Sequence, residues 1–231
     1  MAEGRLVVRR LLESRFPVRS VLVSPAGLAA MEQDLAAAAA PVFVAEPAVL
    51  EQVAGFDVHR GVLACAARLP LPTATDVIEG ARRLAVVEDL TDHENLGALF
   101  RNAAAFGLDA VLLSPRCCDP LYRRSVRVSV GAALTVPYTR LAPWPGGLEQ
   151  LRAHGFALVA LTPDPESEPL DDLARRPPDR LAVVVGAEGP GLTDEVIAAC
   201  DRSVHIPMAP GVDSLNVATA AAIAFHRTRP T

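Results

Sequence analysis

Four long apolar runs in the second part of the chain limit most strongly what it can fold into. Each run stays apolar over successive residues, which is typical of parallel strands that helices cover on both faces. Helical patterns separate the runs, so the order of elements predicts an open, mostly parallel α/β sheet. The runs are RLAVVEDL at 83–90, DAVLLSP at 109–115, FALVALTP at 156–163 and RLAVVVGAE at 180–188.

The helices between these strands are indicated by apolar residues at helical spacing and by glycines where they end. A further short strand, SVHIP, is expected at 203–207. The polar, proline-rich segment at 163–180 is expected to be a surface loop, because a strand resumes directly after it. The expected helices are 95–107, 120–134, 147–155, 193–201 and the segment from 214 onward.

The first part of the chain predicts a smaller α/β unit. The segment PLPTATD at 70–76 holds two prolines and few apolar residues, so it predicts a connection between folding units. We therefore expect a small domain at 1–70, a linker at 71–80 and a second domain at 81–231. In the small domain the expected strands are 19–25, 41–46 and 60–69, and the expected helices are 5–14, 27–40 and 48–56.

Composition excludes several classes of protein. No run approaches the roughly 18 apolar residues of a membrane span. The first residues lack the pattern of a signal peptide, so we expect a cytoplasmic protein. The four cysteines form no C-x-x-C pair and no zinc-like cluster with histidine. We therefore predict no metal site, and we favour buried, reduced thiols over a redox-active pair of Cys117 and Cys118.

The net charge of −5 argues against nonspecific coating of nucleic acid by the whole protein. All 22 basic residues are arginine, whose guanidinium group suits bidentate contact with phosphate. The densest group is Arg123, Arg124 and Arg127 in the segment LYRRSVRVS. A phosphate-binding cluster and a solvated helix face are equally compatible with this pattern.

Three segments that follow predicted strands carry the residues most suggestive of a site. Ligands of open parallel sheets bind beyond the carboxyl ends of the strands, where such segments meet. No one of the three is decisive when it is taken alone. The segments are TDHENLG at 91–97, GAEGPGL at 186–192 and PMAPGVDSLN at 207–216.

In the first segment, Asn95 is expected to cap the helix that follows. Arg101 on that helix lies among apolar residues, where a charge is costly unless it is paired or used. Gly97 precedes it by one turn and is expected to leave open space beside the guanidinium group. A functional arginine and a structural one paired with Glu94 or a neighbouring acid are equally compatible with this spacing.

The second segment has its glycines in the order G-x-x-G-x-G, whereas a dinucleotide loop has G-x-G-x-x-G. Ile206 stands where the ribose-binding acid of such a site belongs, so a nicotinamide-dependent oxidoreductase is a weak match. Glu188 would direct a carboxylate into the space beside the glycines, although a plain tight turn has the same pattern. In the third segment Ser214 is expected to cap the last helix, but capping does not explain Asn216.

Taken together and in this order, the three segments resemble the SpoU (TrmH-type) branch of the SPOUT RNA methyltransferases. The matching motifs are NLGALFRNAAAFG, VVVGAEGPGL and IPMAPGVDSLNVATAAAIA, and the resemblance covers about residues 81–228. The first part of the chain, notably RGVLACA, is similar to the family's small RNA-binding module. The resemblance implies a C-terminal trefoil knot, which binds S-adenosylmethionine, and a homodimer with the last helix as candidate interface.

The implied reaction is methyl transfer to a ribose 2′-hydroxyl of RNA, with ribosomal RNA favoured over transfer RNA. A noncatalytic RNA-binding or ribosome-assembly protein with the same fold is the alternative. The resemblance places the catalytic positions at Arg101, Asn95, Glu188, Ser214 and Asn216. It places cofactor contacts at Leu161, Thr162, Gly186, Glu188, Ile206, Met208 and Leu215. We add the hypothesis that Arg123, Arg124 and Arg127 contact RNA.

Overall fold

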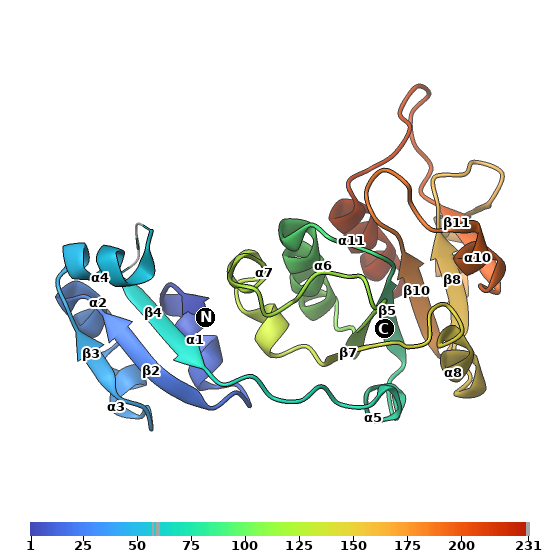
Figure 1. Cartoon of the computed structure of the whole chain (residues 1–231). Coiled ribbons are helices and arrows are strands. Elements are labelled where there is room, and N and C mark those ends of the chain that lie inside the picture. The colour runs from blue at the N-terminus through green and yellow to red at the C-terminus, as the bar shows by residue number, and fades with distance from the viewer. Residues whose placement is uncertain (57, 59–60, 230–231) are drawn as a thin grey trace.

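The structure is a computed structural model that describes residues 1–56, 58 and 61–229, and within these residues the strands form two sheets (Figure 1). The larger sheet has the order β7-β6-β5-β10-β8-β11-β9, and every neighbouring pair is parallel. This arrangement confirms the predicted α/β fold with a mostly parallel sheet. Its strands are β5 (Arg83–Val87), β6 (Ala110–Leu113), β7 (Tyr138–Arg140), β8 (Ala157–Leu161), β9 (Glu168–Pro169), β10 (Leu181–Val185) and β11 (Arg202–His205).

Helices cover both faces of this sheet because its central strands are apolar on both sides. On β5, Ala85 and Val87 belong to one buried cluster, and Leu84 and Val86 belong to the opposite one. The first cluster includes residues of α6 (His93–Ala105), α9 (Leu170–Arg175) and α11 (Val217–Thr228). The second includes residues of α5 (Ala74–Ile78), α8 (Leu148–Ala153) and α10 (Asp194–Ala198).

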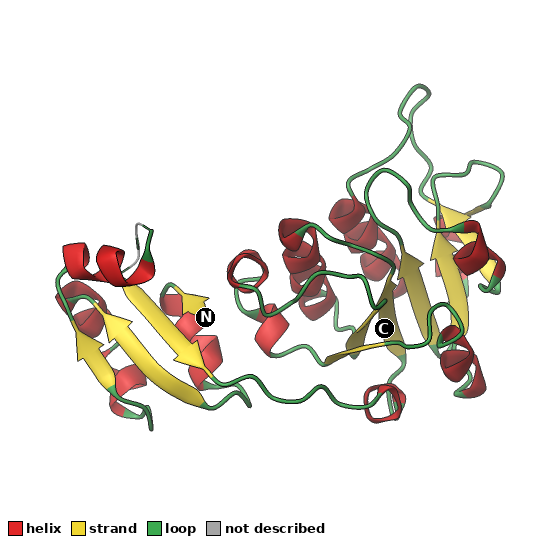
Figure 2. Ribbon diagram, viewed as in Figure 1, coloured by secondary structure: helices red, strands yellow, loops and turns green. Residues whose placement is uncertain are grey.

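Strands of the smaller sheet follow the order β1-β4-β2-β3. The strands are β1 (Ala2–Glu3), β2 (Val18–Val23), β3 (Val42–Val44) and β4 (Val62–Ala66), and the helices around them are α1 (Arg5–Leu12), α2 (Pro25–Ala30), α3 (Glu32–Ala36) and α4 (Pro47–Ala54). An extended connection leads from β4 to α5 and the larger sheet (Figure 2). Val126 and Leu134 from the second part of the chain join the buried cluster of the smaller sheet, so the two parts share apolar packing.

Two long predicted helices are each broken in the structure. The helix expected at 27–40 is divided into α2 and α3 at Met31, which is buried and has non-helical backbone angles. The helix expected at 120–134 is divided at Val130 and Gly131, which both have positive φ. What remains of it is α7 (Arg123–Val128) and a short 3-10 helix, η1 (Ala132–Leu134).

The surface loop expected at 163–180 is also wrong in part, because it contains β9 and α9. Leu170 and Leu173 of α9 are three residues apart and fully buried in the core beside α11. Their burial makes this short helix part of the layer that covers the sheet, although the residues around them are polar. No helix within the described residues is long and apolar enough to span a membrane.

Candidate functional site

A cavity of about 410 Å³ lies beside the connections that follow β8, β10 and β11 and beside the first turn of α11. Its position fits the rule that ligands of parallel sheets bind beyond the carboxyl ends of the strands. Residues from three distant parts of the sequence therefore form a single concave surface. The lining residues are Leu161, Thr162, Pro163, Val185, Gly186, Ala187, Glu188, Gly189, Gly191, Ile206, Met208, Ser214, Leu215, Asn216, Val217 and Ala220.

Every residue that the resemblance implied as a cofactor contact lines this cavity. Of the implied catalytic residues, Glu188, Ser214 and Asn216 line it as well. Asn95 joins this group through a hydrogen bond with Asn216. Arg101 is absent from the lining formed by the described residues. The structure thus brings together all the implied positions except Arg101.

The backbone of the 186–191 segment folds back tightly on itself. The N–H group of Gly191 donates to the carbonyl of Ala187 at 3.1 Å. A Cβ atom on Gly186 would lie 2.2 Å from the carbonyl carbon of Gly191, so only glycine fits at that position. This close approach brings the main chains of two lining residues, Gly186 and Gly191, into direct contact.

Asn216 is the N-cap of α11, and its side chain also connects Glu188 with Asn95 beside the cavity. Its Oδ1 accepts from the backbone N–H groups of Ala218 and Thr219 at 3.0 and 3.2 Å. Its Nδ2 donates to Glu188 Oε1 at 2.5 Å and to Asn95 Oδ1 at 2.8 Å. The expectations that Ser214 caps this helix and that capping does not explain Asn216 are both wrong, since α11 begins at Val217 and Asn216 supplies the cap.

The prediction that Asn95 caps α6 is also wrong. The cap is Asp92, whose side chain accepts from the N–H groups of Glu94 and Asn95. Asn95 lies in the first turn, and its side chain is therefore free of the capping role and accepts from Asn216. This hydrogen bond joins the first turn of α6 to the start of α11.

Arg101 is exposed and forms no ion pair with any residue that the structure describes. The expected partner Glu94 pairs with Arg124 instead, at 2.7 Å. The open space expected beside Gly97 does not exist, because a Cβ there would lie 2.7 Å from the carbonyl oxygen of Ser125 on α7. Gly97 thus allows α6 and α7 to pack closely, and the Arg101 side chain one turn later is exposed.

The arginine cluster of α7 is held by acidic residues of its own chain. Arg123 contacts Glu3 at 2.9 Å, and Arg127 contacts the same carboxylate at 3.6 Å. The Glu3 side chain is only 5% exposed, so these ion pairs bind α7 to β1. Arg124 pairs with Glu94 on the surface, where both side chains are more than half exposed.

Asp89, which follows β5, has a φ of 52°, which is uncommon for a residue other than glycine. Its N–H donates to Ser114 Oγ at 2.9 Å, and the hydroxyl donates back to Asp89 Oδ1 at 2.7 Å. A hydrogen bond from Arg116 holds the pKa of Asp89 below its ordinary value. Sequence reasoning missed both Glu88 and Asp89, although two carboxylates directly after a buried strand were the signal.

The four cysteines are free thiols. Cys117 is buried and Cys118 and Cys200 are partly buried, but Cys65 is exposed, so the prediction of buried thiols is wrong there. Burial raises the pKa of Cys118 to about 11 and that of Cys200 to about 12. Among the described residues, no group of three or more His, Cys, Asp or Glu side chains could hold a metal ion.

Residues 82–226 match the SpoU rRNA Methylase family. The chain is 50% identical to the uncharacterized tRNA/rRNA methyltransferase Rv0881 of Mycobacterium tuberculosis, over 99% of this chain and 80% of that protein. It is 36% identical to the 23S rRNA (guanosine-2′-O-)-methyltransferase RlmB of Bordetella pertussis, over 74% of this chain and 70% of the relative.

A crystal structure of an AdoMet-bound rRNA methyltransferase from Sinorhizobium meliloti has the same fold, with a TM-score of 0.82 at 21% identity. The two structures superpose over 98% of this chain and 85% of that one. The family match covers well over half of the sequence and includes all three segments that form the cavity. The chain therefore belongs to the SpoU rRNA methylase family of RNA methyltransferases.

Proposed function

We propose that this protein transfers the methyl group of S-adenosylmethionine to a ribose 2′-hydroxyl of structured RNA. The observation that carries the proposal is the meeting of Asn95, Glu188 and Asn216 beside a cavity built from distant segments. The Bordetella pertussis relative is named as a guanosine-2′-O-methyltransferase of 23S rRNA, which favours ribose over base and ribosomal over transfer RNA.

The cavity suits S-adenosylmethionine in size and in lining. Its volume of about 410 Å³ is within the roughly 300–1,000 Å³ of small-molecule sites. Leu161, Ile206 and Leu215 offer apolar surface to a purine, and the main chain beside Gly186 offers hydrogen bonds. The Sinorhizobium meliloti protein, which shares the fold, is described as AdoMet-bound. When bound, the cofactor supplies a methyl group on a positively charged sulfur.

Polar residues around the cavity would orient the two reactants at in-line distance. Asn216 is fixed by its hydrogen bonds, so it can hold the Glu188 carboxylate in one orientation. Ser214 is exposed at the cavity rim, where its hydroxyl can contact a ribose. The Arg101 guanidinium would stabilise the negative charge that develops on the 2′-oxygen. A guanidinium group is a poor proton acceptor, so we assign Arg101 this stabilising role rather than that of the base. The 2′-hydroxyl proton would leave to solvent water as the new C–O bond forms, and S-adenosylhomocysteine would be the leaving group.

We also propose that two copies complete the site, since Arg101 lies outside the cavity of its own chain. Exposed apolar side chains support a covering partner: Leu215, a lining residue, is 36% exposed, and Val212, three residues earlier, is 49% exposed. RNA would then contact both protomers, with the smaller unit acting as the RNA-binding module. A C-terminal trefoil knot is part of the proposal, and the position of β10 between β5 and β8 is compatible with it.

Arg101→Ala tests this proposal most directly. The variant should bind S-adenosylmethionine with wild-type affinity in isothermal titration calorimetry, since Arg101 does not line the cavity. It should lose most turnover, measured as labelled methyl groups incorporated into ribosomal RNA, and nuclease mapping should find the wild-type product on ribose. Methylation of a base, or wild-type turnover by the variant, would contradict the proposal.

Failure of the wild-type protein to bind S-adenosylmethionine would favour the noncatalytic RNA-binding alternative. Mapping of 2′-O-methyl groups in total RNA from cells with and without the gene would identify the nucleotide.

A further inference from the structure

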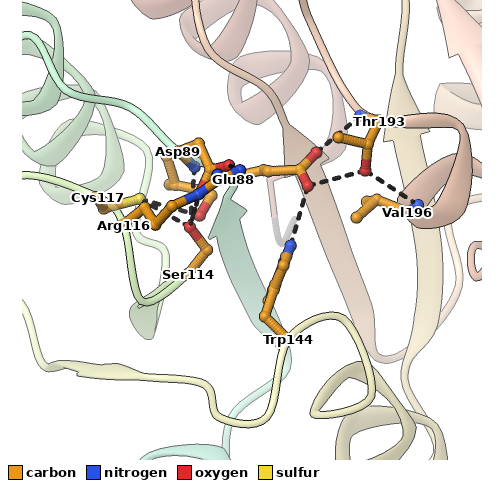
Figure 3. A network of polar contacts seen from close by, with 9 residues as sticks. Glu88, Asp89, Ser114, Arg116, Cys117, Trp144, Thr193 and Val196 are labelled. Carbon is orange, nitrogen blue, oxygen red and sulfur yellow. Dashed lines mark hydrogen bonds and ion pairs between the residues drawn. The ribbon is translucent and has the colours of Figure 1, made fainter.

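A buried carboxylate outside the cavity connects three segments of the larger sheet. Glu88 directly follows β5 and is only 2% exposed. Its Oε1 accepts from Trp144 Nε1 and from Thr193 Oγ1, each at 2.9 Å. Its Oε2 accepts from the backbone N–H of Thr193 at 2.9 Å. Figure 3 shows Glu88 reaching toward Trp144 and Thr193, while its neighbour Asp89 turns toward Ser114 and Arg116.

A carboxylate at this depth is stable only when donors satisfy it, because an ionised group without partners is very costly to bury. Two of the three donors belong to one residue, Thr193, so the carboxylate fixes both its main chain and its side chain. The backbone N–H of Glu88 also donates to the carbonyl of Val185, at 2.9 Å. Glu88 therefore holds the end of β10 and Thr193 at the same time.

Thr193 is where the glycine-containing segment of the cavity ends. It is the N-cap of α10, and it follows Gly191, a lining residue, by two positions. Gly191 in turn is hydrogen-bonded to Ala187 and packed against Gly186, both of which line the cavity. The hydrogen bond between Ala187 and Gly191 closes a short turn that ends two residues before Thr193, so we expect a shift of Thr193 to displace this part of the cavity wall.

We infer that Glu88 is a positioning residue that fixes the 186–193 segment in the conformation that receives S-adenosylmethionine. The inference rests on the proposed function. Glu88 touches neither the cavity nor the proposed reactants, and it acts only through Thr193. Substitution at Glu88 should therefore weaken cofactor binding without changing the affinity for RNA.

Glu88→Gln tests the inference with little change in shape. Both carboxylate oxygens of Glu88 accept hydrogen bonds, but a glutamine side chain has only one oxygen. Its NH2 group would therefore face a buried donor of Trp144 or Thr193. Loss of one such hydrogen bond corresponds to about tenfold weaker binding of S-adenosylmethionine. The product S-adenosylhomocysteine should lose affinity by the same factor, because positioning of the wall does not depend on the charge of the ligand. A selective loss for the charged donor would instead indicate a direct electrostatic effect and overturn the inference.

A pair of threonine variants supplies the matched control. Thr193 and Thr73 both cap short helices, and each accepts a hydrogen bond from the backbone N–H three residues later. Thr193→Val and Thr73→Val remove the same hydroxyl, but only the first removes a bond to Glu88. We expect a higher KM for S-adenosylmethionine and an unchanged KM for RNA in Thr193→Val, and wild-type values in Thr73→Val. This pair carries the test if Glu88→Gln does not fold.

The outcomes separate the two proposals. Equal weakening of both ligands in the Glu88 and Thr193 variants, but not in Thr73→Val, supports the positioning role. Wild-type binding by Glu88→Gln, or equal weakening in both threonine variants, overturns that role and leaves the proposed function intact. A wild-type protein that binds no S-adenosylmethionine overturns the proposed function, and the inference with it.

Discussion

Asn216 donates a hydrogen bond of 2.8 Å from Nδ2 to Oδ1 of Asn95, a residue 121 positions earlier in the chain. The oxygen and the nitrogen of this side-chain amide have different partners. The oxygen caps α11, and the nitrogen contacts Asn95 and Glu188 at the cavity. The stability of the last helix and the shape of the cavity therefore depend on different atoms of one side chain, and substitution can separate them.

Asn216→Asp should keep the helix cap and damage the cavity. A carboxylate still accepts from the N–H groups at the start of α11, and its charge is favourable there. Its second oxygen would face Glu188, where the wild-type protein has a donor at 2.5 Å. We expect near wild-type stability in urea unfolding but clearly weaker binding of S-adenosylmethionine in calorimetry.

Asn216→Ala is the companion variant, because it removes both functions. It should lower the free energy of unfolding by about 1 kcal/mol, the usual cost of a lost cap. Equal stability losses in the two variants would contradict this division of roles.

Motif order was sufficient to identify the cavity, but not the roles of the residues within it. Asp213, Ser214 and Asn216 are all good caps, and only the backbone path shows that the helix starts after Asn216. Asn95 is likewise a good cap, but Asp92 occupies that position. The space expected beside Arg101 is filled because α7 packs against Gly97. Spacing along one helix does not reveal such a tertiary contact.

The parallel strands were predictable because continuous apolar runs have few alternatives between two helical layers. Short elements were not predictable, because a short segment with few apolar residues is compatible with several structures. Leu170 and Leu173 are two apolar residues within a polar, proline-rich segment, and α9 is defined by what they pack against. The position of Glu88 directly after a buried strand was a sequence signal, but its burial and its three donors, which define its role, are visible only in the folded chain.

Gly186→Ala should distort the cavity, because the new Cβ would overlap the main chain of Gly191, at 2.2 Å. Main chain cannot move aside as the end of a flexible side chain can. We expect at least tenfold weaker binding of S-adenosylmethionine, equivalent to about 1.4 kcal/mol. Calorimetry of the folded variant would measure this loss.

Gly155→Ala is the matched control for this substitution. Gly155 lies in open space at a φ of +79°, so alanine there costs only backbone strain of about 1 kcal/mol. The affinity of the Gly155→Ala variant for S-adenosylmethionine should stay at the wild-type value. A similar loss of affinity in the two variants would show that the effect is general destabilisation.

The ion pair between Arg68 and Asp119 should make stability depend on pH. Burial is the largest single effect and acts to raise the pKa of Asp119. The hydrogen bonds from Arg68 and from the backbone N–H of Leu121, together with the nearby charges of Arg68 and Arg140, outweigh burial and hold the pKa below its ordinary value. A lowered folded-state pKa adds stability above the unfolded pKa of about 4, and this stability is lost as the pH falls through the folded value.

Asp119→Asn should therefore be less stable than the wild type at pH 7, and the difference in stability should shrink as the pH falls from 5 toward 3. The difference at pH 7 should be at most about 1 kcal/mol, because both side chains are more than a third exposed. Urea unfolding across this pH range would measure it. Asp179→Asn removes a similar surface contact, with Arg82 at 3.8 Å, and should show little difference at any pH in this range. If Asp119→Asn were less stable than the wild type by the same amount at every pH, titration of Asp119 could not be the cause.

Arg124 is the member of the α7 cluster best suited to test contact with RNA. Arg123 and Arg127 hold the buried Glu3, so their loss would disturb folding, whereas Arg124 pairs only with the exposed Glu94. Removal of one phosphate contact lowers the slope of log affinity against log salt by about 0.7–0.9. Arg124→Ala should show this change in filter-binding titrations with ribosomal RNA, while its affinity for S-adenosylmethionine stays constant. Arg175→Ala, which breaks an equally exposed pair on α9, should leave the slope unchanged. An unchanged slope in Arg124→Ala would assign this arginine to the solvated helix face instead.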